Sequence, residues 1–159
     1  MRSTLLLIML WASFVCHAQS YKLFTTDEDL SSSLINHIYQ DSNGMIWVAT
    51  EDGLNRYDGA KFTTYKHNPE DAHSLSHNYV RRIFEDSKGH IYIGTHNGVQ
   101  VYNPATDTFS EKAILENDRP YNQSITDIIE RNNGEVWVAG YRTGKIEIDG
   151  DKLRLTYLS

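Results

Sequence analysis

The sequence predicts an all-β protein made of three four-stranded antiparallel sheets that follow one another along the chain. Three observations lead to this prediction. A pattern of about 45 residues occurs three times, each copy has a glycine turn between short apolar segments, and turn-forming residues recur too often for long helices. The 159 residues include ten Gly, ten Tyr and only three Pro, which favours aromatic strands joined by tight turns.

The repeat is most regular around one turn. The glycines that close this turn are spaced 45 residues apart, at Gly44, Gly89 and Gly134. A type I turn that ends in a left-handed glycine joins antiparallel strands in this way, because side chains are unfavourable at positive φ. A large ring keeps the same spacing three positions later, as Trp47, Tyr92 and Trp137.

Each copy divides into four short strands. The first strands are expected at residues 35–40, 80–85 and 125–130, and the second at 45–50, 90–95 and 136–140. The third strands are expected at 54–57, 99–102 and 145–148, after turns that end in Gly53, Gly98 and Gly144, and the fourth begin at Phe62, Phe109 and Leu153. Gly144 is one residue late, which we interpret as an insertion. The apolar spacing of the first segments also suits a helix, but a turn ends each after about six residues.

The second strands are apolar on both faces, so both faces should be buried. Repeated four-stranded sheets of this kind are β-propeller blades, here about 30–66, 75–112 and 120–158, and stacked hairpins of a solenoid are the alternative. Residues 21–26 resemble a fourth strand and are expected to close a last blade. Closed propellers have about four to eight blades. We therefore expect either the N-terminal piece of a longer protein or self-association.

The N-terminus has the features of a secretory signal. Arg2 precedes an apolar run over 5–11, and small residues end at Ala18. We expect residues 1–18 to be a signal peptide that is removed, with a retained anchor as the alternative, and residues 19–159 to form an exported, periplasmic propeller segment. Removal would take away Cys16, the only cysteine, and with it any disulfide, thiolate nucleophile or Cys-bound zinc.

Charge and spacing exclude several function classes. The net charge of −6, from 15 basic and 21 acidic residues, argues against nucleic-acid binding. The histidines show no metal-binding spacing, and no carboxylate pair stands out from the repeat. Asp41 and Asp86 are expected to bond turn amides, and Glu85 and Glu130 to be solvated or cross-strand partners. The sequence therefore predicts no catalytic residue, no metal and no cofactor.

If a ligand binds, the geometry of blades indicates where. The fourth-to-first connections and the second-to-third turns lie on one face, and they carry the candidate ligand-binding residues Glu51, Asp52, His96, Asn97, Tyr141 and Arg142. Planar polar groups and an aromatic platform suit a sugar. Tyr141 with Arg142 is the best such pair, because the insertion there breaks the repeat. The ligand expected from this composition is an oligosaccharide.

The repeat resembles the two-component regulator propeller repeat. The motifs that carry the resemblance are Leu75-Ser76 ahead of 80–83, Asp41 to Thr50, and Gly53 to Asp58. The third copy departs from them, as Arg131, Gly140 and Ile148 replace Asp, Thr and Tyr.

The resemblance implies the periplasmic sensor region of a hybrid two-component regulator, in which propellers precede a membrane helix, a histidine kinase, a receiver and a DNA-binding module. Many such sensors respond to glycan fragments. The chain contains no kinase elements, so we expect a non-enzymatic segment that reaches the membrane only through parts outside it. A propeller enzyme acting on glycans, as hydrolase or lyase, and a protein–protein scaffold are the alternatives.

Overall fold

The computed structural model describes residues 23–26, 29–115, 119–150 and 152–157. The predicted signal peptide and its cleavage site lie outside these residues and stay predictions. Among the described residues, no helix is both long enough and apolar enough to cross a membrane.

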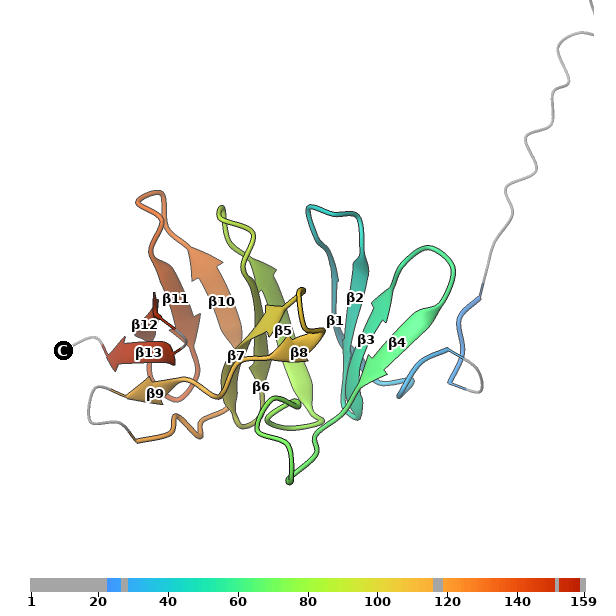
Figure 1. Ribbon diagram of the computed structural model, residues 1–159, viewed down its shortest axis with the longest axis horizontal. Helices are drawn as coiled ribbons and strands as arrows, with labels where there is room; N and C mark the ends of the chain where they lie inside the picture. Colours follow the sequence, from blue (N-terminus) through green and yellow to red (C-terminus); the bar gives the residue numbers. More distant parts are fainter. Residues whose placement is uncertain (1–22, 27–28, 116–118, 151, 158–159) are drawn as a thin grey trace, which may run out of the picture.

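Three twisted sheets stand side by side in chain order (Figure 1). The first sheet consists of β1 (Ile35–Gln40), β2 (Ile46–Thr50), β3 (Gly53–Tyr57) and β4 (Phe62–Tyr65). The second consists of β5 (Val80–Glu85), β6 (Ile91–Thr95), β7 (Gly98–Asn103) and β8 (Thr108–Phe109). The third contains β10 (Asp127–Glu130), β11 (Val136–Ala139), β12 (Gly144–Asp149) and β13 (Lys152–Tyr157). The all-β prediction is confirmed, and the helical alternative for residues 80–85 is wrong.

The third sheet differs from its predicted form in having a fifth strand. β9 (Ile114–Leu115) pairs in parallel with the outer edge of β13, through Arg154 opposite Ile114 and Leu155 opposite Leu115. The four predicted antiparallel strands are present in this sheet, and β9 is an addition that was not predicted. The chain that leaves β8 has no counterpart in the first copy of the repeat, so its pairing could not be taken from the repeat.

The register of the third sheet also differs from expectation. Asn55 pairs with Val48 and Gln100 with Ile93, whereas Gly144 occupies the equivalent place opposite Val138. Gly144 is therefore not the counterpart of Gly53 and Gly98, and the interpretation as a one-residue insertion is wrong. A Cβ at Gly144 would lie 2.9 Å from the Thr156 carbonyl oxygen, so the close approach of β13 requires a glycine there.

The turns after the first strands have the predicted conformation. Gly44, Gly89 and Gly134 have φ of 84°, 84° and 81°. The Asp41 carboxylate accepts hydrogen bonds from the backbone amides of Asn43 and Met45, at 3.0 and 2.9 Å. Asp86 does the same in the second sheet, so the expected role of these two acids is confirmed.

The core lies between the sheets, with one apolar cluster at each junction. Trp47 is fully buried at the first junction and Tyr92 is 2% exposed at the second, in equivalent places. Gly94 lets the third sheet approach, because a Cβ there would lie 2.6 Å from Ile125 Cγ2. The large ring beside a small residue is therefore what lets successive sheets pack face to face.

The described part of the segment 21–26 forms no strand. Phe24 packs instead against the rings of Tyr57 and Phe62, at 5.0 Å between centroids in both cases. This contact covers the outer part of the free face of the first sheet. The expectation that the segment closes a last blade stays a prediction.

Candidate functional site

The two edges of the sheets carry different connections. In Figure 1 the β1–β2, β5–β6 and β10–β11 turns point to one side, and the long connection from β4 to β5 lies on the other. The β2–β3 and β6–β7 turns, which hold the predicted ligand-binding residues Glu51, Asp52, His96 and Asn97, belong to that second side.

Glu51 and Asp52 are held by the connection between the first two sheets. The Tyr79 hydroxyl donates to Glu51 Oε1 at 3.1 Å, and Asn78 Nδ2 donates to Asp52 Oδ1 at 3.1 Å. Lys66 Nζ lies 2.6 Å from Asp52 Oδ2. The hydrogen bond from Lys66 is the main cause that lowers the pKa of the Asp52 carboxyl. Both carboxyl groups thus already have partners within the chain.

His96 joins the same network through its ring. It lies 5.6 Å from the ring of Tyr79 and 5.7 Å from that of His77. Partial burial, and then the proximity of His96, lowers the pKa of the His77 imidazole. Asn97 caps the turn, since its backbone amide donates to Thr95 Oγ1 at 3.0 Å. The structure therefore brings Glu51, Asp52 and His96 together around residues 77–79.

Tyr141 and Arg142 have different surroundings, although both belong to the β11–β12 turn. Tyr141 is 83% exposed. The Arg142 guanidinium lies 5.2 Å from the centre of the Tyr157 ring on β13. Whether any of the six predicted residues binds a ligand stays a prediction.

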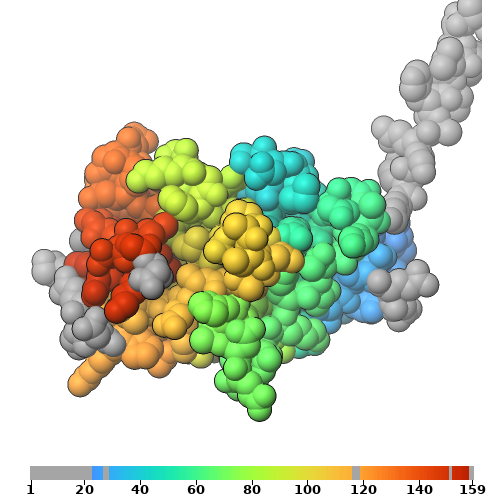
Figure 2. Space-filling view, in the orientation of Figure 1, coloured from blue at the N-terminus to red at the C-terminus, as the bar shows by residue number. Residues whose placement is uncertain are grey.

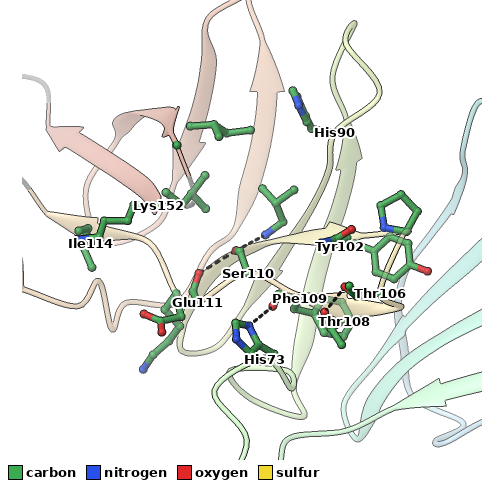
Figure 3. Close-up of a pocket in the computed structure, with 17 residues that line it drawn as sticks. His73, His90, Tyr102, Thr106, Thr108, Phe109, Ser110, Glu111, Ile114 and Lys152 are labelled. Carbon is green, nitrogen blue, oxygen red and sulfur yellow. Dashed lines mark hydrogen bonds between the residues drawn. The ribbon is translucent and has the colours of Figure 1, made fainter.

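A cleft that the sequence did not predict lies between the outer strands of the second and third sheets. Its volume is about 1080 Å³, which is enough for a small oligosaccharide. Figure 2 shows the β7–β8 turn in gold on one side and strands β12 and β13 in red on the other. Figure 3 shows Tyr102, Thr106 and Thr108 on one wall and Lys152 and Ile114 on the other.

The lining of the cleft is mixed. Hydroxyl groups come from Thr106, Thr108 and Ser110, and charges from Glu111, Lys112 and Lys152 (Figure 3). Ile148 is 42% exposed and adds apolar surface on the third-sheet side. Tyr102 and Phe109 are nearly buried and offer only ring edges. The cleft can therefore accept hydroxyl-rich ligands by hydrogen bonds and edge contacts rather than by ring stacking.

The short outer strand of the second sheet creates this cleft. β8 has only two residues, whereas β4 in the first sheet has four. After β8 the chain stays hydrogen-bonded to β7 as far as Ala113, because the Ser110 and Ala113 amides donate to the Val101 and Val99 carbonyl oxygens at 2.8 and 3.0 Å. It then crosses to the third sheet as β9. In the sequence, Pro104 and the longer turn before β8 were the only features that could have indicated the cleft. They do not indicate how far the second and third sheets separate.

Among the described residues, no three or more His, Cys, Asp or Glu side chains are grouped so that they could hold a metal ion. The carboxylates near the cleft have other roles. Asp107, for example, accepts from the Tyr65 and Tyr102 hydroxyls at 2.6 and 2.7 Å and forms an ion pair with Arg56 at 2.9 Å.

Comparisons with known proteins agree with this architecture. The two component regulator propeller family matches residues 29–52 and 74–97. A histidine kinase of Formosa agariphila is 48% identical over 56 residues, which are 35% of this chain and 4% of that protein.

Two solved structures have the same arrangement of sheets. The extracellular domain of a proposed hybrid two-component system of B. thetaiotaomicron matches with a TM-score of 0.72 and 27% identity, over 86% of this chain and 20% of that one. Virginiamycin B lyase from Staphylococcus aureus matches with a TM-score of 0.58 and 21% identity, over 86% of this chain and 44% of the lyase, which shows a common fold alone.

This chain spans only a small part of the Formosa agariphila kinase and of the B. thetaiotaomicron extracellular domain. The matched stretches include the Asp41 and Asp86 turns and the strands β1, β2, β5 and β6 that build the first junction. Residues 29–52 and 74–97 thus match two-component regulator propeller repeats, and the sheets resemble those of the extracellular domain of a proposed hybrid two-component system.

Proposed function

We propose that this chain is the propeller part of an extracytoplasmic sensor in a hybrid two-component regulator, and that it takes part in recognising an oligosaccharide. One observation carries the proposal: the repeat and the sheet arrangement are shared with an extracellular domain of such a system over 86% of the chain. The histidine kinase that contains a closely similar stretch supports the same role. The proposed location is the periplasm.

The cleft between the second and third sheets is the proposed point of contact. It is a ligand-sized hollow, its walls present hydroxyl and ammonium groups, and one of these walls includes Ile114 of β9, which pairs with β13. The acids of the loop network are already bonded to Lys66, Asn78 and Tyr79, so a ligand there would have to displace existing partners. In the cleft, a ligand would displace solvent rather than an existing side-chain partner.

Binding to a panel of neutral and acidic oligosaccharides tests this proposal. The chain would be titrated by calorimetry, and Lys152→Glu should weaken binding of the responding sugar about tenfold. Lys61→Glu is the matched control, because Lys61 holds the corresponding place in the β3–β4 turn and does not line the cleft. Arg142→Ala tests the loop face in the same assay.

Each result has a distinct meaning. A loss of binding in Arg142→Ala with none in Lys152→Glu would move the site to the loop face. No binding to any sugar would contradict glycan recognition and favour a protein–protein scaffold. Chromatography of the sugars after incubation should show no turnover, and a product that disappears when an acidic pair is removed would favour a glycan-active enzyme.

A further inference from the structure

The β7–β8 turn, which forms one wall of the cleft, is also fastened to the first sheet. Thr106 and Thr108 belong to the lining of the cleft, whereas Asp107 between them does not (Figure 3). The Asp107 carboxylate instead bonds two side chains of the first sheet. The Tyr65 hydroxyl donates to its Oδ1 atom at 2.6 Å, and Arg56 Nη1 lies 2.9 Å from the same atom. The wall of the cleft is therefore attached to the neighbouring sheet.

The backbone and a third donor make this attachment specific. Asp107 has a φ of 57° and is the only residue other than glycine with a positive φ in the part of the chain that the structure describes. Aspartate tolerates this left-handed conformation better than most residues. The Tyr102 hydroxyl, which belongs to a residue of the cleft lining, also donates to Asp107 Oδ1, at 2.7 Å. One carboxylate thus joins the cleft, the turn and the first sheet.

The bonds at this carboxylate have a charged acceptor, which makes them stronger than bonds between neutral groups. Burial raises the pKa of the Asp107 carboxyl, but hydrogen bonds from Tyr65 and Tyr102 and the charge of Arg56 outweigh burial and lower the pKa. Burial and the bond to Asp107 raise the pKa of the Tyr65 hydroxyl, so it stays a donor. The Arg56 guanidinium lies 5.6 Å from the ring centres of Trp47, Tyr65 and Tyr102, which hold it between the two sheets. We call Arg56, Tyr65, Tyr102 and Asp107 the Asp107 clamp.

The second junction has a different residue at the place of the arginine. Val101 lies opposite Tyr92 in the second sheet as Arg56 lies opposite Trp47 in the first. Val101 has no charge with which to bind a carboxylate, and it lines the cleft. The β12–β13 turn is also shorter than the β7–β8 turn. The outer parts of the first and second sheets are thus drawn together, whereas those of the second and third separate around the cleft.

We propose that the Asp107 clamp holds the cleft open and that Asp107 is a positioning residue for the ligand. By fastening the turn to the first sheet, the clamp keeps it away from Ile148 on the opposite wall, which is 42% exposed. A released turn would close over Ile148, because burial of apolar surface is favourable. The inference rests on the proposed function in one respect, namely that the ligand binds in this cleft.

The distance between two spin labels tests the proposal without a ligand. The labels would be attached at Ala105→Cys in the turn and at Lys152→Cys on the opposite wall, in the full chain with its only cysteine removed by Cys16→Ser. Double electron–electron resonance should then give a narrow distance distribution. Asp107→Gly suits the positive φ and removes the carboxylate, so it should add a population at shorter distance. Tyr65→Phe should add a smaller one, and it leaves the sequence of the turn intact.

Tyr57→Phe is the matched control, because the Tyr57 hydroxyl donates to the Gly59 carbonyl oxygen, at 2.7 Å, within its own sheet. It should leave the distances unchanged. Unchanged or longer distances in Asp107→Gly would overturn the proposal. A shift in Asp107→Gly without one in Tyr65→Phe would also overturn it, because the cause would then be the backbone freedom of glycine rather than the clamp.

Calorimetry separates this inference from the proposed function. The oligosaccharide of the panel that binds the unaltered chain should bind Tyr65→Phe about threefold and Asp107→Gly about tenfold more weakly, because affinity falls with the fraction of molecules in the open state. Neither residue lines the cleft, so full affinity in both variants would contradict the positioning role. If no sugar binds, the proposed function fails, and the label distances alone decide whether the clamp holds the cleft open.

Discussion

The first two sheets and the third use different residues to give the large ring of the second strand a carboxylate as its hydrogen-bond acceptor. Trp47 Nε1 donates to Asp41 at 2.8 Å, and the Tyr92 hydroxyl donates to Asp86 at 3.1 Å. In the third sheet Arg131 stands at the acid's place, and Trp137 Nε1 donates instead to Glu135 at 3.3 Å. The bond between the ring and a carboxylate is retained, whereas the position of the acid in the turn is not.

A second difference lies on the other side of the sheets. Ser31, Thr50 and Asn55 form a buried hydrogen-bonded group in the first sheet, and Ser76, Thr95 and Gln100 form its equivalent in the second. The third sheet has Tyr121, Gly140 and Gly144 in these places. A single large ring replaces the polar group, and Gly140 makes room for it, whereas Gly144 makes room for β13. The comparison teaches that these positions change together.

The largest expected effect is the loss of the Asp41 carboxylate. Asp41→Ala should lower the free energy of unfolding by about 3 kcal/mol, because it leaves two amides and a buried indole N–H without their acceptor. Glu135→Ala should cost much less, since Glu135 is more exposed and accepts fewer hydrogen bonds. Urea unfolding of the two variants measures the difference. Equal losses would show that the third sheet depends on its acid as strongly as the first.

Gly140→Ala is the next test. A Cβ there would lie 2.3 Å from the Ser124 carbonyl oxygen and 3.1 Å from the Tyr121 hydroxyl, so we expect a loss of about 2 kcal/mol. Tyr121→Phe should cost nothing measurable, because among the described residues the Tyr121 hydroxyl is buried without a hydrogen-bond partner. Thermal unfolding of both variants measures these two losses of stability. A stable Gly140→Ala would contradict the argument that the positions change together.

Acid should weaken the second sheet through Asp86. Burial raises the pKa of this carboxyl, but hydrogen bonds from the side chain and backbone of His90 outweigh burial and bring the pKa below its usual 3.8. The folded state thus gains stability above pH 3.8, and the gain disappears as the pH falls through the lowered pKa. Asp86→Asn should flatten the decrease in the urea midpoint measured from pH 5 to pH 2.5. An unchanged slope would place the acid sensitivity elsewhere.

The smallest effect is expected at the hydrogen bonds that Ser42 and Ser87 donate to Glu85 and Glu130. Glu85→Gln and Glu130→Gln should each lower the free energy of unfolding by about 0.5 kcal/mol, because these bonds are exposed to solvent. The loss should shrink in high salt, which chemical denaturation with and without 1 M sodium chloride would measure. Gln40 makes no such bond among the residues that the structure describes, so its substitution should leave the free energy of unfolding unchanged.

The regular part of the fold was predictable because one turn recurs at a constant spacing. Gly44 and Gly89 fix the ends of β1 and β5, and these strands begin and end at the predicted residues. The third copy was harder to predict, because Gly144 aligns with Gly53 in the sequence but occupies the position of Asn55 in the sheet. A spacing alone does not distinguish a turn glycine from one that makes room for a neighbouring strand.

The candidate sites depend on contacts between sheets, which the repeat does not encode. The sequence placed Glu85 as a solvated or cross-strand residue, yet it bonds Ser42 of the preceding sheet. It correctly grouped Glu51 with His96 on one side, although Tyr79, which links them, was not among the predicted residues. The cleft was missed because it results from the short β8 and from the path of β9.

The position of β9 also bears on aggregation. The outermost strand of a sheet has unpaired backbone groups that can recruit a strand from another molecule. β13 is the longest of the three outer strands, with six residues, and β9 hydrogen-bonds to its free edge at Arg154 and Leu155. The connection between the second and third sheets thereby occupies part of the edge that would otherwise be the most open to pairing with a strand of another molecule.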